Sequence, residues 1–514
     1  MSCYLKKQTI AKSFSLLAAL TIFEKIIAFV FEAIIASVFG SNATTDAYFS
    51  ASEIIGVVDT AFLSSLTVIA LNRYSHWTNT EGDEKAFDLL SRLMSFYLPL
   101  MLGISAAIYI FADPLTYIVA PGYGIEARDA LVRCIRIMAA IPIISCITSF
   151  DLAVLRNKKQ FMITGLKSLF ISVFGILGVV TYAVLGGNGS DILSTAFVVS
   201  MLAFCILTFV RTRKYGKLQV RMPTFTAEVR ITVFMLLPLM ASYGIDRVSL
   251  MVGKVISSML GEGSVSSLNY AHSLYKVVTA VFITNLATIL LTDFNELFAQ
   301  EKYDAVAQKI RSVVSVMTVV LIPITIISIV CSNDVVKIVY ERGSFTPEST
   351  KLVGSVLLVY AINFIPAMIH SLYNQVMYSK GDTKSPMWIA LISIAVNISV
   401  SVSTINVIGL AGVALGTVVA SVIAVLACRF VVQKHLPEFH GCYSVRFAVS
   451  CVISGIACYG AVFLVKLLAL PAFFSFIMST VAGVVSFGAM MLLLRDEIAM
   501  GILQKGMRIL KSKK

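Results

Sequence analysis

Long apolar segments alternate with short polar ones along almost the whole 514-residue chain. A helix needs about 20 predominantly apolar residues to cross the ~30 Å hydrocarbon core of a bilayer. Its backbone polar groups must be satisfied inside the segment, because the hydrocarbon offers no partners. The pattern therefore predicts an all-α, polytopic membrane protein with about fourteen spans, near residues 13–38, 46–70, 88–112, 131–155, 161–185, 191–210, 231–258, 264–291, 309–331, 350–377, 386–408, 410–432, 446–468 and 472–494.

Composition narrows the class further. Hydrophobic residues make up 58% of the chain and charged residues 13%, and no polar block is long enough for a soluble domain. The first apolar segment follows lysines as a signal peptide would, but it continues past Ala36 without a polar break, so we expect an uncleaved helix. The nine cysteines lie mostly in apolar segments and form no CxxC pair, which indicates packing residues and no disulfide frame or metal site.

The basic residues are unevenly distributed between alternate loops. Most Lys and Arg residues fall on the side of the amino terminus, in the linker 211–230, the turn 156–159 and the tail 495–514. By the positive-inside rule, both termini are expected to be cytoplasmic. The net charge of +13 is thus explained by topology and by contact with anionic lipids, and not by nucleic-acid binding.

Two distant stretches resemble each other. DPLTYIVAPGYG (113–124) and NDVVKIVYERGSF (333–345) each precede a proline-containing span and a basic turn, at an offset of about 220 residues. This predicts two pseudo-symmetric six-helix lobes, 1–222 and 223–440, around a central cavity, followed by two helices and a basic cytoplasmic tail in 441–514. Duplicated lobes suit alternating access, so a transporter is favoured over a structural scaffold or receptor.

Several basic residues interrupt the predicted spans. A charge at a helix centre costs about 2.5 to 3.5 kcal/mol on insertion scales, so each should face a cavity or a partner. Seven-residue spacing puts Arg247 and Lys254 on one helix face, and the same spacing relates Lys25 to Glu32. A polar stripe at helical spacing holds His272 and Lys276.

Two interpretations of these charges stay open. Lysine and arginine could bind the phosphates of an anionic substrate in a shared cavity, which we favour for Lys25, Lys254 and Lys276. Alternatively they form internal ion pairs or extend to the membrane surface, which we favour for Lys167 near a span end. For Arg247 the two interpretations are even.

The acidic residues could carry protons, bind sodium or neutralise the basic set. They lie in or near spans, and singly each is more often a counter-ion: Glu24, Glu32, Asp46, Glu53, Asp59 and Asp151. No GxxxxGK[ST] loop and no HExxH motif occurs, so neither ATP hydrolysis nor a metalloenzyme is supported. We expect no cofactor, and coupling to a sodium or proton gradient, to the membrane potential or to the substrate's own gradient.

Six motifs follow one another over nearly the whole chain: FGSNATTDAYFSA (39–51), IVAPGY (118–123), GEGSVSSLNYAHSLYKV (261–277), IVYERGSFTPEST (338–350), KGDTKSP (380–386) and GLAGVALGT (409–417). In this order they resemble the motifs of the lipid II flippases (MurJ, also called MviN) of the multidrug, oligosaccharidyl-lipid and polysaccharide exporter superfamily. The resemblance implies movement of an undecaprenyl-diphosphate-linked peptidoglycan precursor across the bacterial cytoplasmic membrane. It also implies a groove for the lipid tail beside the last two spans.

The resemblance places family arginines and acids on particular residues. One span-1 arginine falls on Lys25, and two acidic positions fall on Glu32 and Asp46. Other arginines are replaced, by Phe31 and Ser273, while Asp59 lies in a third arginine region. Together, the buried charges and the resemblance give a candidate substrate-binding set of Lys25, Arg247, Lys254 and Lys276, and a candidate gating or counter-charge set of Glu32, Asp46, Asp59 and His272.

The family's sodium positions fall on Gly253, Asn397, Ser401, Val413 and Thr417, so the expected carboxylates are missing and only Asn397 and Thr417 match. A set without charge binds a hard cation weakly. Two alternatives to lipid II flipping remain: export of another polyprenyl-linked oligosaccharide or polysaccharide unit, and a transport-inactive scaffold for cell-wall enzymes.

Overall fold

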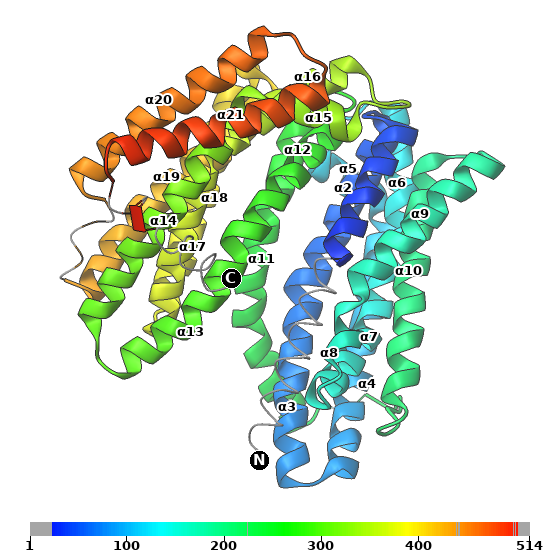
Figure 1. The fold of residues 1–514 in the computed structure, drawn as a ribbon. Helices are drawn as coiled ribbons and strands as arrows, with labels where there is room; N and C mark the ends of the chain where they lie inside the picture. The colour runs from blue at the N-terminus through cyan, green and yellow to red at the C-terminus, as the bar shows by residue number, and fades with distance from the viewer. Residues whose placement is uncertain are drawn as a thin grey trace, which may run out of the picture. The chain divides into compact units, whose positions relative to one another are not determined.

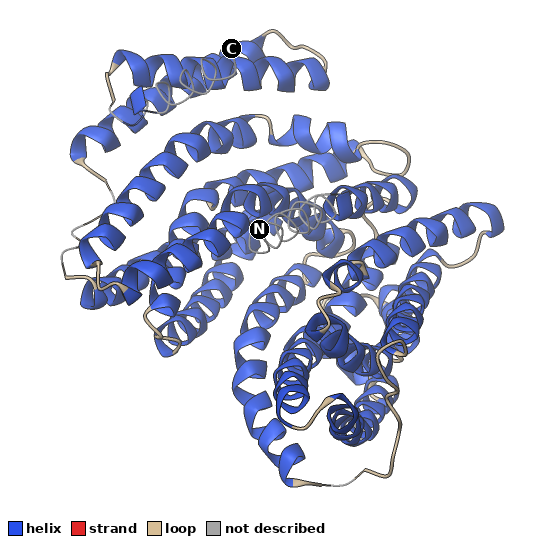
Figure 2. Ribbon diagram, turned by 60° about the horizontal axis from the view of Figure 1, so that its bottom comes forward, coloured by secondary structure: helices blue, strands red, loops and turns tan. Residues whose placement is uncertain are grey.

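The computed structural model describes residues 23–223, 225–437, 439, 441, 443–496, 498 and 500–501. Every regular element of this described part is a helix (Figure 2). Among the described residues, eleven helices are long and apolar enough to cross a membrane, or twelve when the bent pair Pro347–Ile362 and Phe364–Ser379 counts as one span. The all-α, multi-pass prediction is therefore confirmed, whereas the count of fourteen is not. The predicted span 231–258 and the described part of the predicted span 13–38, residues 23–38, are helical but are not among the eleven, and residues 13–22 lie outside the described residues.

The chain divides into two compact units, and the first holds the described residues up to Ser266 together with Gly343–Phe345. Residues 23–39 form its first helix. The elements that follow, labelled in Figure 1, are α2 (Ala43–Val57), the π-helical η1 (Val58–Ser64), α3 (Ser65–Thr80), α4 (Asp83–Ile110), α5 (Ala112–Val119), α6 (Ile125–Met138), α7 (Ile141–Asn157), α8 (Phe161–Gly165), α9 (Lys167–Leu185), α10 (Gly189–Thr212) and α11 (Ala227–Ser258).

The second unit holds Ser267–Arg342 and the described residues from Thr346 on. Its elements are the main part of α12 (Ser264–Thr279), the π-helical η2 (Ala280–Thr284), α13 (Asn285–Ala299), α14 (Tyr303–Val330), α15 (Ser332–Tyr340), α16 (Pro347–Ile362), α17 (Phe364–Ser379), α18 (Lys384–Ile408), α19 (Leu410–His435), α20 (Val445–Leu467) and α21 (Ala472–Leu493).

The order of elements repeats along the chain, as the sequence predicted. The series α2, η1, α3, α4 and α5 matches α12, η2, α13, α14 and α15, and corresponding elements begin about 220 residues apart, as with Asp83 of α4 and Tyr303 of α14. Helix α11 packs on α2, η1 and α3 of the first unit, although the sequence places it in the second lobe. The boundary of a compact unit need not coincide with the boundary of a duplicated lobe, so the predicted lobe boundaries at 222 and 440 stay a prediction.

Local sequence signals explain where several helices begin and bend. Asn42 caps α2, because its side chain accepts hydrogen bonds from the backbone N–H groups of Thr44 and Thr45 at 2.9 and 3.3 Å. Gly186 and Gly409, with φ of +70° and +60°, end α9 and begin α19. The predicted single span 350–377 bends by 46° between α16 and α17. Pro366, in the first turn of α17, lacks the N–H that would continue the helix.

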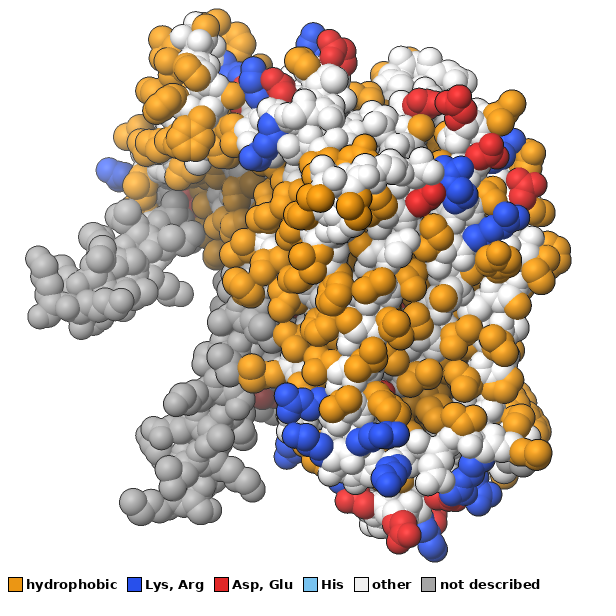
Figure 3. All heavy atoms as spheres, turned by 90° about the vertical axis from the view of Figure 1, so that its right-hand side faces the viewer, with side chains coloured by type: hydrophobic (Ala, Val, Ile, Leu, Met, Phe, Trp, Pro, Cys, Tyr) orange, Lys and Arg blue, Asp and Glu red, His pale blue; other side chains and the backbone are white. Residues whose placement is uncertain are grey.

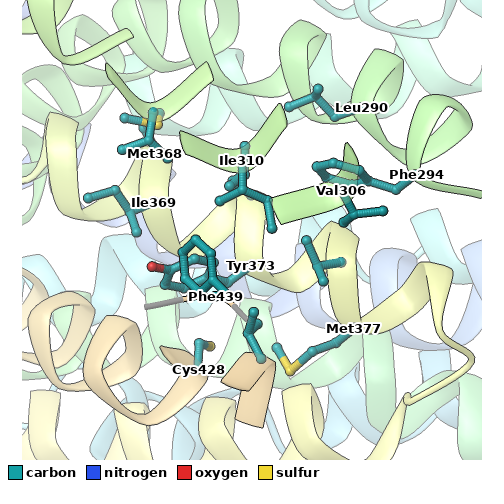
Figure 4. Packing of buried hydrophobic residues seen from close by; sticks show 14 of the residues in the cluster. Leu290, Phe294, Val306, Ile310, Met368, Ile369, Tyr373, Met377, Cys428 and Phe439 are labelled. Carbon is teal, nitrogen blue, oxygen red and sulfur yellow. The ribbon is translucent and has the colours of Figure 1, made fainter. Parts of the chain in front are cut away.

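Each unit has its own apolar core. In the second unit, buried side chains of α13, α14, α17 and α19 interdigitate around Phe294, Ile310 and Tyr373 (Figure 4). In the first, α3, α4 and α7 pack through a cluster that includes Trp77 and Phe150. All seven described cysteines are free and buried, which confirms their packing role: Cys134, Cys146, Cys205, Cys331, Cys428, Cys451 and Cys458.

Large apolar side chains also cover the outside of the helices, as a lipid-facing surface requires. A broad apolar band is visible on one face, with charged side chains gathered above and below it (Figure 3). On α9 and α10 the exposed members include Leu177, Val180, Val184, Leu202 and Ile206. Such continuous exposure would be unfavourable in water and is favourable in hydrocarbon. The protein is therefore a multi-pass membrane protein.

Candidate substrate site

Glu53 of α2 is the centre of a charged cluster in the first unit. Its carboxylate accepts a hydrogen bond from Lys254 Nζ at 2.9 Å and another from Arg247 Nη1 at 3.2 Å, both from α11. The Glu53 side chain is only 8% exposed. Two cations of α11 therefore share one buried anion of α2.

Helical spacing explains why these groups meet. Arg247 and Lys254 are seven residues apart, about two turns, so both project from one face of α11. On α2 and η1, Glu53 and Thr60 are likewise seven apart, and Thr60 Oγ1 accepts from Arg247 Nε at 3.0 Å. Gly56 lies between them, and a Cβ there would be 3.6 Å from Arg247 Nη1. The guanidinium therefore lies within van der Waals distance of this helix face.

Lys254 has further contacts that hold its ammonium in place. Its Nζ donates to the backbone carbonyl of Phe49 at 3.3 Å and lies 5.9 Å from the centre of that residue's ring. The one-face prediction for Arg247 and Lys254 is borne out by their shared contact with Glu53. In the structure, Arg247 forms an ion pair with Glu53 of a neighbouring helix, as the second interpretation predicts.

A second ion pair lies on η1. Asp59 Oδ2 accepts from Lys167 Nζ at 2.7 Å, and Lys167 is the first residue of α9. Lys167 thus forms an ion pair with a neighbouring helix, and the prediction that it extends to the membrane surface stays a prediction. The candidate counter-charge assignment of Asp59 agrees with this geometry.

Asp46 lies at the opposite end of α2 from η1 and is fully buried. Its two carboxylate oxygens accept from the backbone N–H groups of Gly263 and Ser266, each at 2.7 Å. These residues open α12, so the carboxylate satisfies N–H groups that a helix start leaves unpaired. Ser41 strengthens the junction, since its Oγ is 2.7 Å from the Gly263 carbonyl and 2.8 Å from Ser266 Oγ.

The segment Gly343–Phe345 also packs on the first unit. Ser344 N donates to the Ser37 carbonyl at 2.8 Å, and Ser344 Oγ donates to the Val38 carbonyl at 2.9 Å. Gly343 has φ of +60°, and a Cβ there would clash with the Ser37 carbonyl. The ERGSF motif thus places its glycine where only a residue without a side chain fits.

The remaining predicted residues of span 1 lie on the described helix 23–39. Lys25 is exposed and Glu32 is half-buried. Phe31, where the resemblance leads one to expect arginine, is 7% exposed, and its ring fills the space beside Gly175 of α9. This position therefore contributes packing between helices and no charge.

The predicted residues of α12 beyond Ser266 belong to the second unit. Lys276 is exposed. The His272 ring lies 5.9 Å from the Tyr275 ring, nearly parallel at 17°, and 5.8 Å from the Tyr360 ring. Since Lys25 and Lys254 are in the first unit and Lys276 is in the second, a cavity shared by the three stays a prediction.

Four of the five predicted sodium positions come together in the second unit. Asn397 Nδ2 donates to Thr417 Oγ1 at 3.4 Å, while Ser401 Oγ donates to Asn397 Oδ1 at 3.0 Å and lies 3.5 Å from the Val413 carbonyl. These neutral groups satisfy one another, and the set includes no carboxylate. Among the described residues, no group of three or more His, Cys, Asp or Glu could hold a metal ion. A set of neutral oxygen donors binds a hard cation weakly, and the sodium site stays a prediction.

Glu53 is a functional candidate that its sequence position does not single out. From the sequence alone it is one possible counter-ion among several acidic residues. A signal was present in the sequence, because Glu53 and Thr60 share the seven-residue spacing of Arg247 and Lys254. What the sequence lacked was the knowledge that these two helix faces pack together.

The fold and the charged cluster define a duplicated, all-helical, multi-pass transporter. A family model described as "Lipid II flippase MurJ" matches residues 35–485. The chain therefore belongs to the MurJ family, a family of transporters and not of enzymes, and the predicted resemblance is confirmed.

Relatives and solved structures agree with this assignment. A probable lipid II flippase MurJ of Rickettsia prowazekii is 25% identical over 427 residues, covering 80% of this chain and 82% of the relative. One from Bdellovibrio bacteriovorus is 22% identical over 463 residues and covers 87% of each chain. The structure "Lipid II flippase MurJ, inward closed conformation" has a TM-score of 0.80 at 17% identity, covering 95% and 99%. An inward-facing MATE-family multidrug transporter reaches 0.67 at 13% identity, covering 81% and 95%. These structural likenesses concern the fold.

Proposed function

We propose that this protein moves lipid II, the undecaprenyl-diphosphate-linked peptidoglycan precursor, from the inner to the outer leaflet of the cytoplasmic membrane by alternating access. The observation that carries the proposal is the family match over residues 35–485. The fold likeness to a lipid II flippase MurJ structure supports it. Because the family's chemistry is translocation, no covalent step is required of any residue.

The cationic residues would bind the diphosphate. Arg247 and Lys254 are placed on one face of α11, and Lys25 and Lys276 would add charge from other helices. Arginine offers a planar fork and lysine a compact point charge, and both suit phosphate oxygens. Positively charged side chains are costly within a membrane, and a bound diphosphate would compensate their charge. This favours a substrate whose anionic part enters the site.

The acidic residues would gate the site or balance its charge. Asp46 fixes the start of α12 to α2 through two backbone hydrogen bonds. A transporter that alternates between states needs contacts that exist in one state and open in the other. We assign Asp46 to such a contact, and Glu32 and His272 stay candidates for the same class of role.

Export of another polyprenyl-linked glycan is the second candidate, and one observation favours it. Phe31 stands at a position where the resemblance leads one to expect arginine, and it packs against Gly175. A site with one cation fewer could accept a different headgroup while keeping the diphosphate. Knockout would then remove a surface polysaccharide and leave growth intact.

We assign both termini to the cytoplasm, on the uneven distribution of Lys and Arg between alternate loops. The basic linker and tail would contact anionic lipids of the inner leaflet. Cell-wall synthesis enzymes would be partners at the same surface. Fusing a reporter that is active only in the cytoplasm to the carboxyl terminus checks the orientation, and an inactive reporter would contradict it.

Complementation tests the function. A strain depleted of its own lipid II flippase should grow when this chain is expressed at normal level, and Lys254→Ala should abolish that rescue. Lys466→Ala is the matched control, because Lys466 pairs with Asp334 at 2.6 Å and lies outside the charged cluster. Absence of rescue by the well-expressed wild-type chain would refute the lipid II assignment. Rescue by a Lys25, Lys254 and Lys276 triple alanine variant would favour the scaffold.

A further inference from the structure

The two cations of α11 that would bind the substrate's phosphate are already bound to a carboxylate of the protein. Glu53 accepts from Lys254 at 2.9 Å with one oxygen and from Arg247 at 3.2 Å with the other. A carboxylate that bridges two cations through its two oxygens uses the same donors that a phosphate group would use. Glu53 therefore occupies the position of an anionic ligand.

The exposure of the three side chains is graded. Glu53 is 8% exposed, Lys254 11% and Arg247 36%. Arg247 thus keeps part of its guanidinium open, while its Nε is bound to Thr60. An incoming anion can contact Arg247 without first displacing Glu53, and Lys254 becomes available only when Glu53 moves away.

The charge balance leaves the cluster receptive to a stronger anion. One carboxylate faces two cations, so the three groups together carry one excess positive charge. A diphosphate brings more negative charge and more acceptor oxygens than a carboxylate does. The exchange would lose the two bonds to Glu53 and gain charge-assisted bonds to phosphate oxygens.

The location of Glu53 gives it a route to move. It lies on α2 five residues before η1, where the chain winds as a π-helix from Val58 to Ser64. Such segments interrupt the regular hydrogen-bond ladder and often occur at functional sites. Thr60 lies within η1, so one element connects the Arg247 contact and the helix that carries Glu53.

We propose that Glu53 is a resident anion that holds Arg247 and Lys254 when no substrate is bound, and that the substrate's diphosphate competes with it for these two cations. The inference rests on the proposed function in that it identifies the ligand as a polyprenyl diphosphate. After release of the substrate, Glu53 rebinds both side chains. The internal ion pair thereby prevents the diphosphate from being held too tightly to leave.

A binding measurement on the purified full-length protein tests this competition, with undecaprenyl diphosphate as the probe. Glu53→Gln removes the competitor and should raise the affinity at least about tenfold, a change that corresponds to ~1.4 kcal/mol. In a flipping assay the same variant should show a lower KM together with a lower kcat. Lys254→Ala should weaken binding. Equal or weaker binding by Glu53→Gln would overturn the proposal, because Glu53 would then only position the lysine.

Asp334→Asn is the matched control. Asp334 pairs with Lys466 at 2.6 Å and is 13% exposed, close to the burial of Glu53, but it belongs to the second unit. It should leave the affinity for undecaprenyl diphosphate unchanged. A rise in this variant equal to that of Glu53→Gln would also overturn the proposal, since any lost ion pair would then act alike.

A measurement on the wild-type chain avoids variants that fail to fold. An apolar carbodiimide joins a carboxylate directly to a neighbouring amine, so it should crosslink Glu53 to Lys254, which mass spectrometry detects. Undecaprenyl diphosphate should suppress this crosslink severalfold, and uncharged undecaprenol should not. The Asp334 to Lys466 crosslink is the internal standard. If saturating undecaprenyl diphosphate leaves both crosslinks unchanged, the competition is refuted.

The two proposals fail in distinguishable ways. If the chain rescues a lipid II flippase-depleted strain but the probe leaves the Glu53 to Lys254 crosslink intact, the competition is wrong and the function stands. If the chain gives no rescue but the probe still suppresses the crosslink, lipid II is the wrong substrate. Glu53 would then regulate a site for another polyprenyl diphosphate.

Discussion

Replacement of Asp46 by alanine should destabilise the folded protein strongly. The Asp46 side chain is fully buried, and its two oxygens accept from Gly263 N and Ser266 N at 2.7 Å each. Alanine leaves both N–H groups without that acceptor. A buried donor that loses its partner costs about 1–3 kcal/mol, so the two together should cost roughly 2–6 kcal/mol. Asp46→Asn should cost less, because its amide oxygen still accepts one of the two bonds.

Thermal unfolding of the purified protein in detergent measures this effect, and complementation in a flippase-depleted strain measures its consequence. Asp382→Ala is the matched control. Asp382 also accepts from the first turn of a helix, through Ser385 N at 3.0 Å, and bonds His435 at 3.2 Å, but its side chain is 19% exposed. Loss of one partly exposed side-chain acceptor at a helix start typically costs about 1 kcal/mol. The Tm should therefore fall more for Asp46→Ala than for Asp382→Ala.

The opposite order of the two Tm values would refute the reasoning. It would show that Asp46 is bonded differently in the membrane from what the hydrogen bonds to Gly263 and Ser266 indicate. Full stability of Asp46→Ala combined with loss of rescue would separate a gating role from a structural one. Loss of both in Asp46→Ala, with partial recovery in Asp46→Asn, is the result that we expect.

Three further predictions use other contacts. Lys167→Ala should reduce stability, because it leaves the half-buried carboxylate of Asp59 without this partner. In a double-mutant cycle, the double variant Lys167→Ala with Asp59→Ala should recover part of the loss, and additive losses would show that the two side chains do not interact. Asp151 is fully buried, with one oxygen bonded to a threonine hydroxyl and the other without a hydrogen-bond partner in the described part. Asp151→Asn should therefore change the free energy of unfolding by no more than about 1 kcal/mol, and a large drop in Tm would disprove this. Gly343→Ala should destabilise by more than about 1 kcal/mol, because its φ of +60° and the nearby Ser37 carbonyl both disfavour a Cβ, and an unchanged Tm would show that the segment moves freely.

The sequence predicted what depends on periodicity. Apolar stretches fixed the order of the spans, and the offset between DPLTYIVAPGYG and NDVVKIVYERGSF predicted the repeated element order that α4, α5, α14 and α15 display. Seven-residue spacing correctly put Arg247 and Lys254 on one face. These features follow from the geometry of a single helix and need no knowledge of its neighbours.

The sequence did not predict what depends on which helix faces which. Glu53 was one of several acids, and only the packing of α2 against α11 selects it as the partner of Lys254. Lys167 lies near a span end, and its sequence position does not show that η1 places Asp59 within hydrogen-bonding distance of it. The bend between α16 and α17 could not be predicted from the sequence either, because a proline in an apolar segment, here Pro366, is compatible with a kinked or a straight span.

The charges of the first unit together favour exchange over permanent pairing. A cation left alone in a membrane is costly, so a resting transporter needs an internal anion for each buried cation. Lys167 has Asp59 to itself, and this one-to-one pair has no reason to open for a substrate. Arg247 and Lys254 share the single carboxylate of Glu53. An anionic substrate gains most where one carboxylate serves two cations, and this difference from the Lys167 pair supports our proposal that the Glu53 cluster binds the diphosphate.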